Sequence, residues 1–264
     1  MRFLLLLVTI ITTISTTAQG VSMSPSRLFF TGNPGETVRE TITISNSSTT
    51  KDYVLSIDFK DWKREIDGNK VYFKADSLAN SNALWLSTLE NTVSVPAGTT
   101  KEVVLIMQIP KNASTTAVTN SMLFFTQIPT QEDRSSAQTG LGIITLFEFG
   151  LHVYYTPPNN NTKSLEITNI EEIVNENSIN KNATISIFND GNVINDATVE
   201  FELTNTETGK EIKLKSKSIS MMPQTSQIVK FELPEGLSGT YLGVAIVKMA
   251  GTNDLRVGEK TFAF

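Results

Sequence analysis

The sequence predicts an all-β protein made of two tandem β-sandwich domains. Three observations lead to this prediction. Apolar and polar residues alternate in many short segments, which is typical of strands buried on one face. Proline, glycine or asparagine turn signals separate these segments at the spacing found in sandwiches. The two halves of the chain also repeat the same order of segments, on either side of Pro157-Pro158.

The first 20 residues have the composition of a secretory signal peptide. Arg2 precedes an apolar run from Phe3 to about Ile14, and Ala18-Gln19-Gly20 fits the small-x-small rule for cleavage. This run is short for a membrane span, although the alternative is that it serves as an anchor. We expect residues 1–20 to be removed during export, which leaves a mature chain from Val21 with no integral membrane span.

Residues 21–157 contain the strand pattern of the first sandwich. The predicted strands in this part of the chain are Thr37–Asn46, Asp52–Trp62, Val93–Val95, Lys101–Ile109 and Ser121–Ile128. Asp67-Gly68-Asn69 lies between two strand-like runs and predicts a hairpin turn. Helix is expected to be scarce, with room for one turn within residues 76–89.

A long apolar strand, Leu141–Tyr155, is predicted at the end of this domain, after the polar segment Thr130–Gly140. Its odd positions form one strongly apolar face. Most strands run only about five or six residues, so this strand is expected to extend beyond its own domain. Its side chains can fill the core of that domain, or the strand can join the sheet of another protein by β-augmentation.

Residues 158–264 repeat features of the first domain. Thr41–Asn46 is similar to Thr184–Asn189, and the strand between Pro96 and Pro110 is similar to the one between Pro223 and Pro234. In each half, a strand ends at an asparagine and a later strand lies between two prolines. The sequence therefore predicts two related immunoglobulin-like sandwiches of about 135 and about 105 residues, close to the usual size of such domains.

Composition argues against catalysis, metal binding and nucleic-acid binding. The chain has no cysteine, a single histidine (His152) and a net charge of −5, with no basic block. Cys/His pairs and His-rich zinc sites are therefore excluded, and no phosphate-binding loop is recognisable. A nucleic-acid partner requires a basic surface that this sequence does not offer. We expect a non-enzymatic protein without a cofactor.

Several segments, in order, resemble those of the PapD-like periplasmic pilus (fimbrial) chaperones. Val21–Gly32 resembles their first strand, which carries an arginine. Ser121–Pro129 resembles their penultimate strand, and Leu141–Pro157 resembles their final strand, which ends in aromatic-x-Pro. The resemblance covers the whole first domain, and the second is compatible in size and strand pattern.

The resemblance implies a periplasmic assembly chaperone that binds exported, pilin-like β-rich subunits by lending them a strand. The donor side chains would be Leu141, Ile143, Thr145 and Phe147. The client's C-terminal carboxylate would be held by Arg27 and by the residue at the position of the family's lysine, which is His152 here. An outer-membrane assembly platform is a further candidate partner.

A second class of function fits the same sequence. Tandem sandwiches also build non-enzymatic structural or adaptor proteins of cell-envelope and surface assemblies. In that case the apolar strand fills the protein's own core and Arg27 is an ordinary solvated strand residue. A neighbouring gene for a pilin-like subunit or an outer-membrane usher would favour the chaperone.

Overall fold

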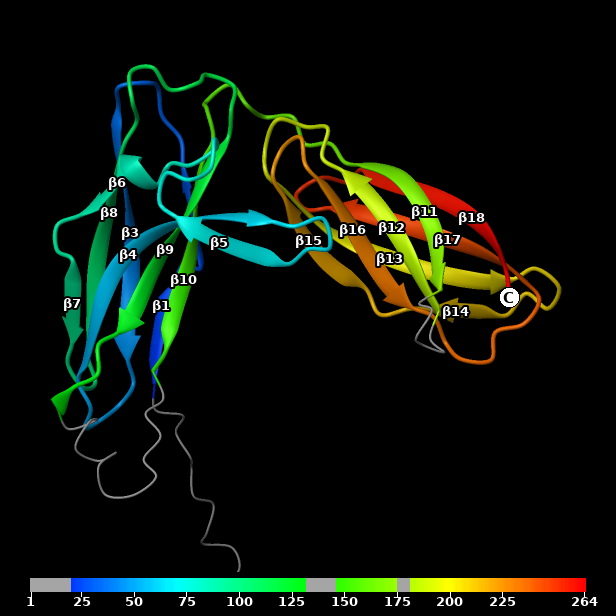
Figure 1. Ribbon diagram of the computed structural model, residues 1–264, viewed down its shortest axis with the longest axis horizontal. Coiled ribbons are helices and arrows are strands. Elements are labelled where there is room, and N and C mark those ends of the chain that lie inside the picture. Colours follow the sequence, from blue (N-terminus) through cyan, green and yellow to red (C-terminus); the bar gives the residue numbers. More distant parts are fainter. Residues whose placement is uncertain (1–19, 132–145, 175–180) are drawn as a thin grey trace, which may run out of the picture.

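The computed structural model describes residues 20–131, 146–174 and 181–264. These ranges contain eighteen strands, β1 to β18, and the 3₁₀ helix η1 (Ala83–Trp85). The prediction of an all-β chain is confirmed, and η1 falls within residues 76–89, where one helical turn was expected. The strands form two sandwiches set at an angle to each other, like the arms of an L (Figure 1).

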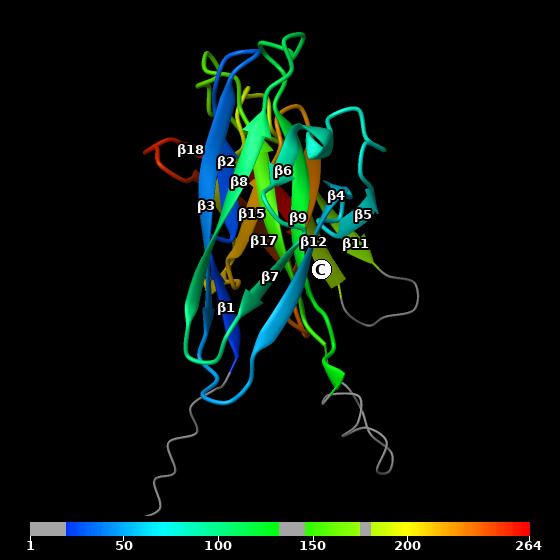
Figure 2. The same ribbon diagram turned by 90° about the vertical axis from the view of Figure 1, so that its left-hand side faces the viewer.

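The first sandwich consists of two sheets built from strands between Val21 and Tyr155. In order, one sheet contains β1 (Val21–Ser24), β3 (Thr37–Asn46), β8 (Thr100–Gln108) and β6 (Leu86–Thr88). The other contains β2 (Arg27–Phe30), β10 (Glu148–Tyr155), β9 (Thr119–Gln127), β4 (Tyr53–Arg64) and β5 (Lys70–Lys74), and β7 (Thr92–Val95) also pairs with β4. Figure 2 views this sandwich from its outer side.

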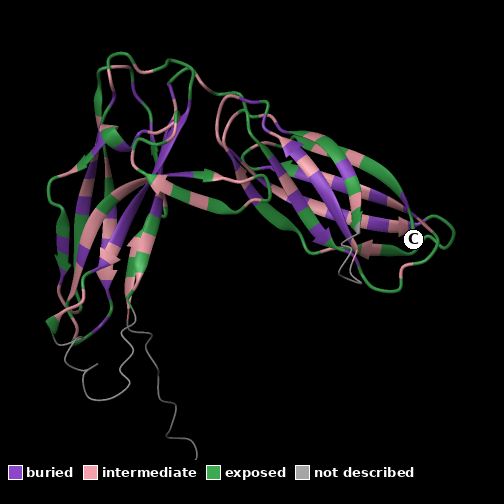
Figure 3. Ribbon diagram, viewed as in Figure 1, coloured by how far each residue is buried: buried purple, intermediate pink, exposed green. Residues whose placement is uncertain are grey.

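The second sandwich is built from strands between Glu166 and Ala263. Its smaller sheet contains β11 (Glu166–Val174), β12 (Lys181–Phe188) and β16 (Ser226–Glu232). Its larger sheet contains β14 (Glu211–Lys213), β13 (Asn195–Asn205), β17 (Thr240–Met249) and β18 (Leu255–Ala263), and β15 (Lys217–Met221) also pairs with β13. Buried and exposed residues alternate along the strands, so each sandwich encloses its own core (Figure 3).

The internal repeat predicted from the sequence corresponds to a repeated strand pairing. β3 pairs with β8 in the first sandwich, and β12 pairs with β16 in the second. The asparagine at the end of each first strand is buried and plays the same part in both halves. Asn46 donates to the carbonyl of Val95 at the end of β7, and Asn189 donates to the carbonyl of Met221 at the end of β15. Each side chain therefore ties its strand to the sheet opposite.

The β4–β5 hairpin extends from the first sandwich to the second (Figure 1). Its turn is the predicted Asp67-Gly68-Asn69, in which Gly68 has a φ of 91°, a conformation that favours glycine. Beside this turn, the carbonyl of Ile66 accepts a 2.6 Å hydrogen bond from the backbone N–H of Ile228 in β16. The hairpin thus joins the edge of a sheet in the other domain.

A buried carboxylate organises the loop that follows this hairpin. Asp61 on β4 has no exposed surface. It accepts hydrogen bonds from the backbone N–H groups of Ser77 and Leu78 and from the hydroxyl of Ser81, at 2.6–2.8 Å. Hydrogen bonding of this kind is what makes a buried charged group tolerable, so Asp61 has a structural role.

Candidate functional site

Strand β10 has an open edge over its first half. One edge pairs with β9 from Glu148 to Tyr155, whereas the other pairs with β2 only from His152 to Tyr155. No described strand pairs with the second edge between Glu148 and Leu151. The cause is that the N-terminal segment changes sheets, since β1 pairs with β3 and only β2 reaches β10.

The hydrogen bonds to β2 show which backbone groups face this open edge. The N–H groups of His152 and Thr156 donate to carbonyls at Ser26 and Phe30, so the even-numbered residues point towards β2. Because backbone groups alternate along a strand, those of Glu148 and Gly150 point to the open edge. An edge of this kind is a template for pairing with another chain.

The apolar face of β10 changes from closed to partly open along the strand. Leu151, Val153 and Tyr155 are at most 2% exposed and belong to the core of the first sandwich. Phe147 and Phe149 pack against the same core but are only partly buried, with ring centroids 5.2 Å apart. The second half of the strand therefore fills the protein's own core, which was one of the two interpretations of the sequence. At the beginning of the strand, part of the surface of the two phenylalanine rings remains exposed.

The predicted donor side chains lie only in part within the described residues. Phe147 lies at the start of the open edge, where its ring also contacts that of Tyr53 at 5.3 Å. Leu141, Ile143 and Thr145 lie outside the described residues.

The two residues predicted to hold a carboxylate lie side by side. Arg27 on β2 and His152 on β10 are direct partners in the register of the two strands. The guanidinium of Arg27 is already engaged, because its Nη1 lies 2.8 Å from both carboxylate oxygens of Asp196 in the second sandwich. Nothing in the sequence indicated this ion pair, whose members are 169 positions apart and both about one-third exposed.

The ion pair changes the proton affinity of both partners. The hydrogen bond to Asp196 raises the pKa of Arg27. Burial by itself would raise the pKa of Asp196, but the hydrogen bond and the charge of Arg27 outweigh it and hold that pKa below its ordinary value. At neutral pH, Arg27 is therefore already paired with a carboxylate of its own chain.

His152 is surrounded by cations and by aromatic rings. Lys70 on β5 places its Nζ 2.8 Å from His152 Nε2, and the Trp62 ring centroid lies 4.4 Å from that of the imidazole. Burial first, and then the charges of Lys70, Arg64 and Arg27, lower the pKa of His152 to about 4. At neutral pH the imidazole is uncharged, so its Nε2 accepts the hydrogen bond from the ammonium group of Lys70.

Lys70 and Arg64 were not among the residues singled out from the sequence. They face each other across the β4–β5 hairpin, where they form a register pair. The turn signal at Asp67-Gly68-Asn69 predicts such a pair, but nothing in the sequence shows that the hairpin brings Lys70 to His152 on β10.

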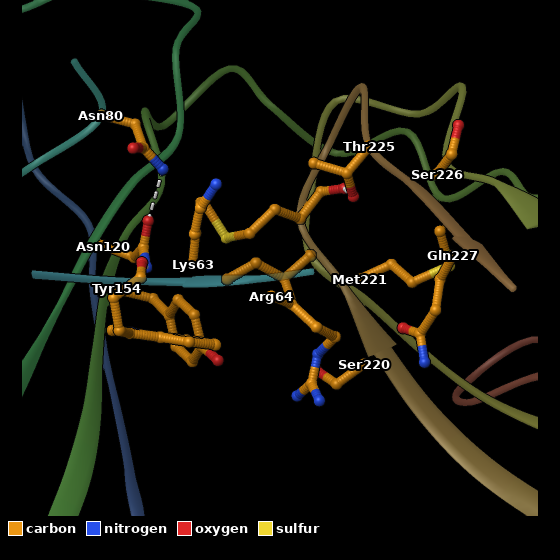
Figure 4. A pocket seen from close by; sticks show the side chains of 13 residues that line it. Lys63, Arg64, Asn80, Asn120, Tyr154, Ser220, Met221, Thr225, Ser226 and Gln227 are labelled. Atoms are coloured by element: carbon orange, nitrogen blue, oxygen red, sulfur yellow. Dashed lines mark hydrogen bonds between the residues drawn. The ribbon is translucent and has the colours of Figure 1, made fainter. Parts of the chain in front are cut away.

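Apolar residues of both sandwiches meet next to this polar cluster. Trp62, Met122, Phe124 and Tyr154 form a small core in the first sandwich, and Ile194 and Met222 of the second pack against it. A hollow of about 80 Å³ lies at this junction, and side chains from both domains point into it (Figure 4). A wider hollow of about 600 Å³ lies between the domains and is lined by Arg27, Arg64 and Asp196, among others.

The described ranges contain no group of histidine, aspartate or glutamate residues arranged to hold a metal ion. Nor does any helix in them have the length and apolar character needed to cross a membrane.

Comparison with solved structures shows which proteins share this architecture. The crystal structure of the class 5 fimbriae chaperone CfaA matches with a TM-score of 0.52 and 14% identity, covering 91% of this chain and 99% of that one. The fold is that of the fimbrial chaperones. The crystal structure of the YadV chaperone also matches, with a TM-score of 0.52 and 9% identity, covering 92% of this chain and 99% of that one.

These likenesses confirm the fold that the sequence resemblance implied, and both structures are described as those of chaperones. The sequence matches no protein-family model, and no curated protein is similar to it at a significant level.

Proposed function

We propose that this protein is a non-enzymatic periplasmic assembly chaperone that binds exported pilus-like or surface subunits by β-strand donation. The observation that carries the proposal is the open edge of β10 at Glu148–Leu151, next to the partly buried rings of Phe147 and Phe149. An unpaired edge with adjoining apolar surface is what β-augmentation requires. The fold shared with CfaA and YadV supports the proposal.

In this proposal the lent strand begins before β10, and its donor side chains are Leu141, Ile143, Thr145 and Phe147. They fill the gap in a client sandwich that lacks a strand, while the open backbone edge pairs with a client strand. Both contacts protect the client from edge-to-edge aggregation until it is assembled.

The two domains have different parts in the proposal. Residues 1–20 direct export and are removed, residues 21–157 carry the donor strand, and residues 158–264 close the far side of the site. The client's carboxylate binds at Arg27, which lines the wider hollow between the domains, and at His152, its partner in the register of β2 and β10. His152 is neutral at pH 7 and contributes no charge of its own there.

Co-expression in a bacterial periplasm with the subunits encoded beside its gene tests the proposal. We expect a β-rich subunit to co-purify in a stoichiometric complex, and Phe147→Asp to abolish the complex because a carboxylate cannot enter an apolar groove. Leu89→Asp is the matched control, since Leu89 is 82% exposed and lies on another part of the same domain.

Because Phe147 also touches the protein's own core, Ile143→Asp provides a second variant, and thermal unfolding checks both. Loss of the complex with unfolding unchanged supports strand donation. A large, stable assembly that withstands both changes would instead indicate a structural adaptor of the cell envelope.

A further inference from the structure

Strand β18 lies at the end of the larger sheet in the second sandwich. One side of it pairs with β17 in an unbroken register over nine residues, and no described strand pairs with its other side. Natural edge strands are usually protected by a bulge, a proline or a short length. β18 has none of these, whereas β11, an edge strand of the smaller sheet, contains a register shift. β18 therefore presents a long backbone edge to which another strand can be added.

The hydrogen bonds to β17 show which backbone groups face this edge. The N–H groups of Gly239 and Phe264 each donate to the other residue's carbonyl, at 3.2 and 3.0 Å. Hydrogen-bonded pairs alternate with non-bonded pairs along an antiparallel ladder, so the even-numbered residues of β18 bond to β17. The odd-numbered residues point their N–H and C=O groups to the open side. The carbonyl of Leu255 accepts a 3.2 Å hydrogen bond from the side chain of Arg256, and a carbonyl can accept a second one.

The side chains beside this edge combine apolar surface with opposite charges. Leu255 and Val257 are 52% and 58% exposed. Asp254, just before the strand, and Lys260, within it, are also exposed, and neither forms an ion pair with another described residue. Apolar side chains next to an unpaired edge favour association with another strand.

We propose that the protein forms a two-fold symmetric dimer in which β18 of one copy pairs antiparallel with β18 of a second copy. The axis passes through Val257, which lies opposite Val257 of the second copy. Leu255 then lies opposite Glu259, and Asp254 lies opposite Lys260, each twice. The larger sheets of the two second sandwiches become one continuous sheet.

Like charges exclude the neighbouring registers. In a two-fold pair of identical strands, residue i lies opposite j and j lies opposite i. An axis at Gly258 would place Arg256 opposite Lys260 of the second copy. An axis at Glu259 would oppose two glutamates, and an axis at Arg256 would oppose two arginines. Like charges directly opposite each other destabilise a strand pair.

The axis at Val257 brings complementary groups together. Each Asp254 carboxylate meets a Lys260 ammonium group of the second copy. Leu255 and Val257 of both copies gather on one face of the joined sheet, where they cover part of each other's apolar surface. The odd-numbered backbone groups of the two strands face each other, so they can exchange hydrogen bonds. Backbone, apolar surface and charge therefore agree on this one register.

The dimer does not use the donor strand. The open edge at Glu148–Leu151 belongs to β10 in the first sandwich, whereas β18 belongs to the second. Both copies therefore keep the edge that the proposed function assigns to subunits, and the dimer does not depend on that function.

Sedimentation equilibrium of the protein purified from a bacterial periplasm tests the proposal. We expect reversible dimers between about 10 µM and about 1 mM, as suits an interface at the small end of the size range. Val257→Lys opposes two ammonium groups on the axis and should weaken the dimer at least about tenfold. Leu89→Lys is the matched control, because Leu89 is an exposed apolar residue of the first sandwich, and it should leave the dimer unchanged. Thermal unfolding checks that both variants are folded.

A charge exchange tests the register. Asp254→Lys and Lys260→Asp each oppose like charges twice, so each should weaken the dimer about tenfold, whereas the double variant should restore it. An equimolar mixture of the two single variants should form a heterodimer, because both of its cross-strand pairs have opposite charges. Failure of both the double variant and the mixture to associate would overturn the proposal.

Two further outcomes would also overturn it. One is a wild-type protein that stays monomeric up to about 1 mM. The other is a dimer that is lost in Phe147→Asp and kept in Val257→Lys, which would place the interface on β10. Subunit capture separates the dimer from the proposed function: if wild type captures no subunit but dimerises through β18, strand donation is wrong and the dimer stands.

Discussion

Acidification should destabilise the native protein through His152 in a defined pH range. The pKa of this histidine falls from 6.5 to about 4 on folding. Since a tenfold change in proton affinity corresponds to about 1.4 kcal/mol, this fall limits the loss of stability to at most about 3–4 kcal/mol. Because the imidazole is partly exposed and solvent screens the neighbouring cations, we expect about 2 kcal/mol.

The sign follows from proton binding. The unfolded chain takes up the proton as the pH falls below 6.5, whereas the native protein does so only near pH 4. The contribution of neutral His152 to the free energy of unfolding is therefore fully present above pH 6.5. It is lost progressively as the pH falls to 4. Carboxylates with a lowered pKa, such as Asp196, lose their contribution at still lower pH.

Urea unfolding between pH 4 and 7.5 measures this loss, with His152→Gln as the reference. Since glutamine does not titrate, the difference in pH dependence between the two proteins isolates the histidine. NMR titration of the single imidazole gives the native pKa directly. A native pKa near 6.5, or the same pH dependence in both proteins, would refute the account of a neutral histidine held among Lys70, Arg64 and Arg27.

Two further variants test the loop held by Asp61 and the contact between the domains at Gly68. Asp61→Ala removes a buried acceptor of three hydrogen bonds and should lower the free energy of unfolding by about 3–5 kcal/mol. Asp58→Ala, on the exposed side of the same strand, is the control and should change it by less than about 0.5 kcal/mol. Equal urea midpoints for the two variants would contradict the structural role of Asp61. Gly68→Ala strains a positive φ and places a methyl group 2.8 Å from a side-chain nitrogen of the second domain, so it should accelerate amide exchange at Ile228. Gly98→Ala strains a similar φ with no atom within 4 Å and should leave that amide unchanged; acceleration in both variants would show that the hairpin contact is not the cause.

Periodicity was sufficient to predict most strands because each sheet turns one face towards the core of its sandwich and the other face outwards. Thr37–Asn46 is found as β3 with the predicted bounds, and Lys101–Ile109 differs from β8 by one residue at each end. The hairpin turn was equally predictable, since the Asp-Gly sequence supplies the positive φ that it needs.

The candidate site was only partly predictable, because its contacts join segments that are far apart in the chain. The resemblance indicated Arg27 and His152, and the parallel pairing of β2 with β10 makes them neighbours. Asp196 reaches Arg27 from the other domain, and Lys70 reaches His152 from another strand of the same sheet. A single sequence contains no signal for such long-range side-chain pairs.

Amide exchange along β10 is the most direct measurement of strand donation. In the free protein, the N–H groups of Phe149 and Leu151 face β9, while those of Glu148 and Gly150 face the open edge. When a subunit is bound, we predict that exchange slows strongly at Glu148 and Gly150 and changes little at Phe149 and Leu151. Unchanged exchange at Glu148 and Gly150 in a stable complex would show that the subunit binds elsewhere and that β10 is not the donated strand.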